Sequence, residues 1–132
     1  MHNAAYRFGA SEKTTKWAFS MSTKTVFVAN DWHAGLGPVY IASRFRPHGV
    51  FPDARTVFAI HNMSHQGVEP ANTFDGIGVP GEWYGALEWV FPEWARAHEL
   101  DTGEAVNYLK GAIDCADRVV TVSEVSTILL LH

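Results

Sequence analysis

Two short apolar runs of this 132-residue chain end in polar, titratable and aromatic residues. Residues 25 to 30 read TVFVAN, which is typical of a buried strand, and the polar stretch at its end includes Asn30, Asp31 and His33. Residues 56 to 60 form a β-branched and aromatic run that is followed by His61. Because ligands of open parallel α/β sheets bind beyond the carboxyl ends of the strands, the pattern predicts one shared site at two strand ends.

The segment between these two runs has the spacing of a helix. Apolar residues recur from Leu36 to Phe45 at intervals that predict a helix over residues 34–45, with Pro38 tolerated in its first turn. A strand, a helix and a strand of this length imply parallel pairing through a right-handed crossover. A third β-branched run at 118–122 predicts a third strand.

The region between the second and third predicted strands begins with many glycines and prolines and ends with a helical pattern. Residues 68–82 predict a loop with one short helix, because they hold too many Gly and Pro residues for a continuous one. Residues 103–116 place apolar side chains on one face and predict a helix with Thr102 as its N-cap. We therefore expect an α/β domain over residues 25–132, with three parallel strands and crossover helices. Residues 1–24 are expected to be a poorly defined N-terminal segment.

The overall composition argues against several classes of protein. Hydrophobic residues make up 47% of the chain and charged residues 18%, as in folded globular proteins. The formal charge of −4 comes with no basic stripe, which argues against a nucleic-acid partner. No run reaches the roughly 18 apolar residues that a membrane span needs. Cys115 is the only cysteine, which excludes an internal disulfide and favours a role as a small core residue.

Four longer stretches of the sequence resemble one family. They read TVFVANDWHAGL, FAIHNMSHQGVEP, PGEWYGALEWVFPEWARAHELD and GEAVNYLKGAIDCADRVVTVS, and they cover about residues 24 to 123. Together they resemble the N-terminal catalytic domain of plant and algal soluble starch synthases of glycosyltransferase family 5, the type I enzymes in particular. The resemblance implies a partial Rossmann-like parallel sheet from the N-terminal half of a GT-B glycosyltransferase. It also implies a location in a plastid, either chloroplast or amyloplast.

The resemblance further implies a reaction and its substrates. The family transfers glucose from ADP-glucose to the non-reducing end of an α-1,4-glucan in starch biosynthesis, with retention of configuration and without a metal ion. The expected partners are therefore ADP-glucose and the glucan, and no cofactor is expected beyond this donor. Such a reaction passes through an oxocarbenium-like state, which requires hydrogen bonds to sugar hydroxyls and donors for the departing phosphate.

Roles for individual residues follow from the same resemblance. His61 matches the histidine that contacts the donor glucose and is the predicted catalytic residue. Trp32 is expected to offer the glucan an aromatic face, and Asn107 to reach the donor glucose from a helix. Gln66 and Gly67 are expected to form part of the site wall, since glycine permits close backbone approach to a ligand. The predicted substrate-binding residues are Asp31, Trp32, His33, Asn62, Gln66, Gly67 and Asn107.

A different class of function, a metal-dependent hydrolase, is the alternative interpretation of these residues. The residue types of a metal site are present, in Asp31, His33, His61 and His65. Their spacing matches no tight ligand motif, such as two histidines separated by one helical turn. No metal ion is therefore predicted.

Two features of the family are not expected in this chain. Residues 1–24 contain no loop of the KTGGL type, which helps to bind the ADP phosphates, and no second Rossmann-like domain is expected. The isolated chain is therefore expected to have negligible transferase activity. The alternative function is that of a catalytically inactive, truncated fragment that binds glucan or associates with other, full-length starch synthases.

Overall fold

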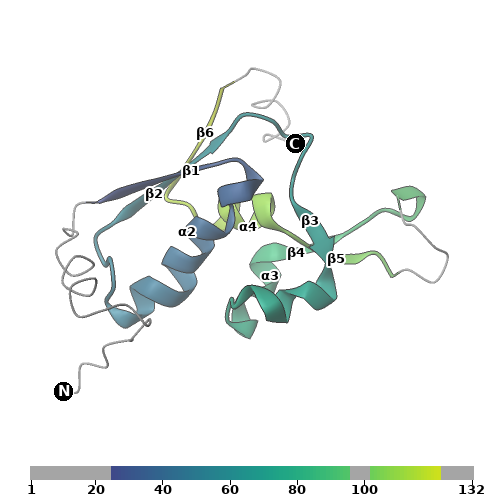
Figure 1. Ribbon diagram of the computed structural model, residues 1–132, viewed down its shortest axis with the longest axis horizontal. Helices are drawn as coiled ribbons and strands as arrows, with labels where there is room; N and C mark the ends of the chain where they lie inside the picture. The colour runs from purple at the N-terminus through teal and green to yellow at the C-terminus, as the bar shows by residue number, and fades with distance from the viewer. Residues whose placement is uncertain (1–24, 96–101, 123–132) are drawn as a thin grey trace.

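The computed structural model describes residues 25–95 and 102–122, and a parallel sheet lies along one side of it (Figure 1). The sheet has three strands in the order β1-β2-β6, namely β1 (Val26–Asn30), β2 (Arg55–Ile60) and β6 (Arg118–Thr121). Both pairs of neighbouring strands are parallel. The three predicted strands are confirmed, each within one residue of its expected bounds.

Helix α2 forms part of the connection from β1 to β2. It spans Leu36–Tyr40, is continued by the π-helical turn η2 (Ile41–Phe45) and ends in the 3-10 turn η3 (Arg46–His48). Gly49 follows with a φ of 71°, a left-handed conformation that favours glycine and ends the helix. The predicted helix is confirmed, but it starts later than expected because Trp32–Ala34 form a separate 3-10 turn, η1.

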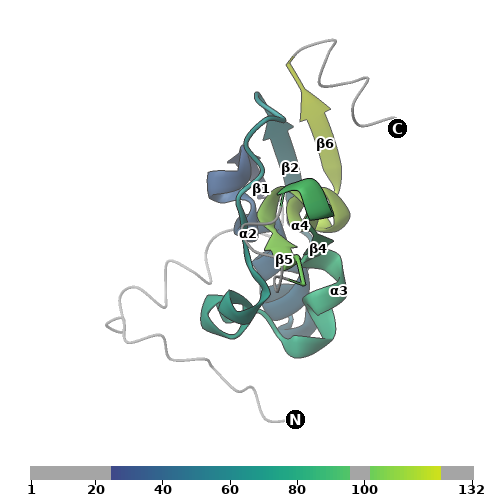
Figure 2. The same ribbon diagram turned by 90° about the vertical axis from the view of Figure 1, so that its right-hand side faces the viewer.

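A second sheet, which the sequence pattern does not predict, is inserted between β2 and β6. It is antiparallel and has the order β3-β5-β4. Its strands are β3 (Val68–Pro70), β4 (Glu88–Val90) and β5 (Glu104–Asn107). Strand β5 runs directly into helix α4 (Tyr108–Cys115), so that the small sheet and the amino end of α4 lie together (Figure 2).

The prediction of one helix over residues 103–116 is therefore wrong in its first part. The segment becomes a strand because β5 pairs with β3 on one side and β4 on the other. The pairing buries Ala105 and Val106 completely. Tertiary partners of this kind override a local helical pattern.

The prediction that Thr102 is the N-cap of this helix is also wrong, because a strand and not a helix follows Thr102. Helix α4 begins after Asn107, whose side-chain oxygen accepts a hydrogen bond from the Lys110 N–H at 2.9 Å. The hydroxyl of Thr102 lies before β5 and accepts a long hydrogen bond, 3.4 Å, from the Glu104 N–H. Asparagine is a strongly preferred N-cap residue, so the true cap has the expected chemistry at a different position.

Replacing Asn107 with alanine is expected to lower the free energy of unfolding by about 1–2 kcal/mol, because it removes the cap and a buried side-chain hydrogen bond. Replacing Thr102 with alanine is expected to change it by less than about 0.5 kcal/mol. Urea unfolding followed by circular dichroism measures both. Equal effects of the two substitutions would contradict the assignment of the cap.

Short helical turns, instead of one helix, occupy the Gly- and Pro-rich segment after β3. Turns η4 (Ala71–Ile77) and η5 (Gly81–Trp83) each follow a proline directly. Helix α3 (Tyr84–Leu87) and, after β4, the turn η6 (Glu93–Ala95) complete the connection. The predicted lack of a continuous helix is confirmed, whereas a strand and two turns occupy the place of the one expected short helix. No helix in the described part of the chain is long and apolar enough to cross a membrane.

Two apolar clusters hold these elements together. The first lies between the parallel sheet and α4 and consists of Ala29, Phe58, Ile60, Leu109 and Ala112. The second lies around α2, α3 and β5 and consists of Val39, Phe74, Val79, Leu87 and Val106. Burial of one large aliphatic or aromatic side chain contributes roughly 1.5–3 kcal/mol, so the large side chains of these clusters stabilise the fold.

Helices α2 and α4 lie on the same side of the parallel sheet (Figure 1). On the opposite face, the strand register places Val28 beside Val57. The exposed fractions on this face are 57% for Val26, 60% for Val28, 45% for Val120 and 62% for Val122. These four residues, which we call the valine row, are open to solvent in the described part of the chain.

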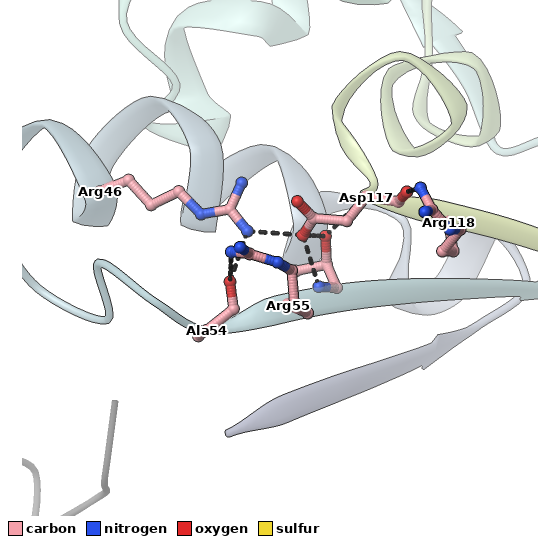
Figure 3. Close-up of polar contacts among 6 residues, drawn as sticks. Arg46, Ala54, Arg55, Asp117 and Arg118 are labelled. Carbon is pink, nitrogen blue, oxygen red and sulfur yellow. Dashed lines mark hydrogen bonds and ion pairs between the residues drawn. The ribbon is translucent and has the colours of Figure 1, made fainter. Parts of the chain in front are cut away.

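Asp117, which directly precedes β6, lies at the amino end of the parallel sheet (Figure 3). Its Oδ2 accepts hydrogen bonds from the Arg46 guanidinium, from the Thr56 N–H at 2.7 Å and from the Thr56 hydroxyl at 2.9 Å. Burial alone would raise the pKa of Asp117, but these hydrogen bonds and the charge of Arg46 outweigh burial and lower the pKa to about 2. Asp117 therefore ties η3, β2 and β6 together as a carboxylate.

Candidate functional site

The carboxyl ends of β1 and β2 are joined by the side chain of Asp31. The Asp31 N–H donates to the Ala59 carbonyl oxygen at 2.9 Å, which continues the strand pairing. The Asp31 Oδ1 atom accepts hydrogen bonds from the N–H groups of His61, at 2.7 Å, and Asn62, at 3.3 Å. The carboxylate thus fixes the backbone that follows β2, and the two strand ends lie together where the sequence predicts a shared site.

The backbone of Asp31 has an unusual conformation, with φ 54° and ψ 178°. This region favours glycine and costs other residues of the order of 1–3 kcal/mol. The two backbone hydrogen bonds to the carboxylate oppose this cost. Strain of this kind occurs mainly at functional sites, which supports the assignment of the site to this strand end.

The imidazole of His61 lies beside the last residue of β1. Its Nε2 atom is 3.2 Å from the Asn30 Oδ1 atom, and both side chains are exposed. When Asn30 Oδ1 accepts, a neutral His61 carries its proton on Nε2 and presents Nδ1 as an acceptor. The sequence places Asn30 in the polar stretch at the first strand end but assigns it no role, and the structure brings it to His61.

Trp32 and His33 form a stacked aromatic pair. Their ring centroids are 4.0 Å apart and their planes differ by 28°. Gly67 has a φ of 64°, and a Cβ atom added there would lie 2.4 Å from Cε3 of Trp32. The close approach that Gly67 permits in this structure is therefore an approach to the indole ring.

An open cavity of about 370 Å³ lies at this strand end. It is lined by Asp31, Trp32, His33, Asn62 and His65. The first four are predicted substrate-binding residues, and the volume falls in the range of small-ligand pockets. His65 entered the sequence analysis only as a metal-ligand type, because nothing in its local pattern shows that it faces a cavity.

The remaining predicted residues lie beside or behind this cavity. Gln66 and Asn107 contact each other, with a hydrogen bond of 2.7 Å from Asn107 Nδ2 to Gln66 Oε1. Asn107 is 1% exposed, so its carboxamide is engaged inside the protein. A direct contact of any of the predicted residues with substrate, including those that line the cavity, stays a prediction.

The Cys115 thiol is a core group in this structure. Burial, reinforced by Asp114 and opposed by Lys110, raises the pKa of Cys115 to about 11, so the thiol is protonated at neutral pH. It packs against the second core cluster. Among the described residues, no three His, Cys, Asp or Glu side chains converge as a ligand set for a metal ion.

Comparison with known proteins assigns the family. A family model described as the starch synthase catalytic domain matches residues 2–127. The chain belongs to the starch synthase catalytic domain family. Soluble starch synthase 1 of Oryza sativa subsp. japonica is a similar member, 66% identical over 101 residues, which are 76% of this chain and 16% of that protein. Starch synthase 1 of Arabidopsis thaliana is 59% identical over 106 residues, which are 80% of this chain and 16% of that protein.

A solved starch synthase structure confirms the fold. The catalytic domain of starch synthase IV from Arabidopsis thaliana, bound to ADP and acarbose, is similar with a TM-score of 0.57 and 26% identity. The match covers 84% of this chain and 21% of that one. The expectation of an α/β, partial Rossmann-like sheet from a GT-B starch synthase is therefore confirmed. The chain spans about a sixth (16%) of the length of the curated starch synthases it matches.

Proposed function

We propose that the described residues form one wall of the active site of a starch synthase-type glucosyltransferase. The reaction is transfer of glucose from ADP-glucose to the non-reducing end of an α-1,4-glucan. The observation that carries the proposal is the strand-end site, where the Asp31 carboxylate holds His61 beside an aromatic-lined cavity in a member of this family. The similar structure bound to ADP and acarbose supports these substrates.

His61 is proposed to contact the donor glucose. Its ring stands at the end of the parallel sheet, and its Nδ1 atom faces away from the bond to Asn30 as a free acceptor in the neutral tautomer. A hydrogen bond from a sugar hydroxyl to this atom orients the glucose while the bond to phosphate breaks. Asp31 acts on this step by fixing the backbone of His61.

The glucan acceptor is proposed to bind at the cavity lined by the stacked Trp32 and His33 rings. The C–H faces of sugars are apolar and pack against aromatic rings, while Asn62 supplies hydrogen-bonding groups for the hydroxyls. Following the family resemblance, the proposal includes no metal ion and no cofactor beyond the ADP-glucose donor.

A plastid location is proposed on the names of similar proteins. The starch synthases of rice, potato, wheat and Arabidopsis thaliana that the chain resembles are all named chloroplastic/amyloplastic. Starch synthesis from ADP-glucose in the same compartment fits the proposed reaction.

The second candidate function is binding without turnover. The valine row leaves an apolar sheet face open in the described residues, which favours association with another protein such as a full-length starch synthase. The cavity is the same in both candidates, so glucan binding alone does not separate them. Turnover does.

A chimera tests the proposal. The 101 matched residues are grafted into soluble starch synthase 1 of rice, and incorporation of labelled glucose from ADP-glucose into glycogen is measured beside the 132-residue chain alone. We expect an active chimera, loss of at least about 100-fold in its activity on His61→Ala, and negligible incorporation by the chain alone. A folded but inactive chimera, together with glucan binding by the chain, would favour the second candidate.

A further inference from the structure

The loop that lines the cavity is joined to helix α4 by a directional series of hydrogen bonds. The Lys110 N–H donates to Asn107 Oδ1 at 2.9 Å, and Asn107 Nδ2 donates to Gln66 Oε1 at 2.7 Å. Gln66 Nε2 then donates to the carbonyl oxygen of Met63 at 3.3 Å. We call these three bonds the carboxamide relay. It runs from the first turn of α4 to the middle of the loop after β2.

Both ends of the carboxamide relay fix its direction. A backbone N–H can only donate, so Asn107 must turn its oxygen toward Lys110 and its NH2 group toward Gln66. A backbone carbonyl can only accept, so Gln66 must turn its NH2 group toward Met63 and its oxygen toward Asn107. Neither carboxamide can flip without placing like groups against each other.

Backbone bonds hold only the end of the loop. The N–H groups of Tyr108 and Leu109 donate to the carbonyl oxygens of Gly67 and Gln66, each at 3.1 Å. The side chain of Gln66 reaches further back, to Met63, which is next to the cavity residue Asn62. Together with the bonds from the Asn62 N–H to Asp31 Oδ1 and from the Ser64 N–H to Asn62 Oδ1, it holds the part of the loop that faces the cavity.

We propose that Gln66 is a positioning residue for this site. It pairs with the Asn107 carboxamide, whose direction the Lys110 N–H fixes, and it helps to hold the loop from Asn62 to His65 in the shape that lines the cavity. The inference rests on the proposed function, since it takes an α-1,4-glucan as the ligand of the cavity. It assigns Gln66 an action through other residues, in place of the direct sugar contact expected from the sequence.

Two substitutions of Gln66 break the carboxamide relay in different ways. Gln66→Glu keeps an oxygen toward Asn107 but sets a carboxylate oxygen against the Met63 carbonyl, whereas Gln66→Met removes both bonds at similar size. Asn72→Asp in η4 is the matched control, because it makes the same carboxamide-to-carboxylate change at an exposed site outside the loop.

The measurement is the affinity of the complete 132-residue chain for maltoheptaose, by calorimetry, with circular dichroism as a check of folding. We expect roughly tenfold weaker binding for both Gln66 variants, since breaking the partly buried hydrogen bond leaves the Met63 carbonyl without its partner, and a change within about twofold for Asn72→Asp. Unchanged affinity in both folded Gln66 variants would overturn the inference.

Nuclear magnetic resonance separates failure of the inference from failure of the proposed function. In the wild-type chain, the side-chain NH2 protons of Asn107 are expected to exchange with solvent far more slowly than those of Asn72, and to lose this protection in Gln66→Met. Equally fast exchange in the wild-type chain would overturn the inference. Protected Asn107 protons in a chain that binds no maltoheptaose would overturn the proposed function and leave the carboxamide relay standing.

Discussion

Replacing Asp117 with alanine is expected to lower the free energy of unfolding by about 3 kcal/mol. The substitution removes three hydrogen bonds to one carboxylate oxygen, from Arg46 and from two groups of Thr56. Hydrogen bonds to a charged group contribute about 1.5–3 kcal/mol each, and the loss is not additive because water reaches the partly exposed site. Urea unfolding at neutral pH measures the change.

The loss from Asp117→Asn is expected to be smaller, about 1 kcal/mol, because the amide oxygen still accepts but carries no charge. This variant also tests the pH dependence. The folded-state pKa of Asp117, about 2, lies below the ordinary value of 3.8, so the unfolded chain holds the proton more tightly. The contribution of this carboxylate is therefore complete above about pH 4 and is lost as the pH falls toward 2. The Asp117→Asn variant is expected to lack this share of the acid sensitivity.

The matched control for Asp117 is Asp114→Ala. Asp114 pairs with Lys110 one helical turn away at 3.1 Å, but its side chain is 47% exposed. Exposed pairs of this kind contribute less than about 0.5 kcal/mol. An Asp117→Ala loss no larger than that of Asp114→Ala would show that the contacts in Figure 3 do not hold the sheet.

Replacing Gly67 with alanine is expected to cost about 2–4 kcal/mol of stability and to weaken maltoheptaose binding at least about tenfold. The new Cβ atom would lie 2.4 Å from Cε3 of Trp32, a distance that forces the indole or the loop to move. The indole is part of the cavity wall, so the ligand surface changes with it. Thermal unfolding and calorimetric titration measure the two effects.

Gly49→Ala separates backbone strain from the steric contact. Gly49 has a φ of 71°, close to the 64° of Gly67, but no atom lies within 4 Å of the place where its Cβ would stand. It is expected to cost about 1 kcal/mol, through the left-handed conformation alone, and to leave glucan affinity unchanged. If Gly67→Ala behaves like Gly49→Ala, the contact with Trp32 has no functional role.

The parallel sheet could be predicted from the sequence because its signals are local. Each strand is a β-branched run with a clear end, and the helix between β1 and β2 has its own apolar spacing. The small antiparallel sheet could not be predicted in this way. Strand β5 has a helical pattern that continues into α4, and only its pairing with β3 and β4 makes it a strand.

In the candidate site, too, only the features with a local sequence signal could be predicted. The strand-end rule predicts that Asp31 and His61 meet, and a hydrogen bond of 2.7 Å joins them. The contact of Gln66 with Asn107 spans 41 positions of sequence, so no local pattern reports it. His65 was missed as a lining residue because the shape of its loop, set partly by that contact, decides where it faces.

The insertion of the small sheet between β2 and β6 has a consequence for the order of folding. Val26 pairs with Arg55, whereas Val57 pairs with Arg118, so the second pairing closes a loop about twice as long. We expect β1, α2 and β2 to assemble first and β6 to join last. Asp117 sits at the start of this late strand, so we expect Asp117→Ala to speed unfolding more than it slows folding.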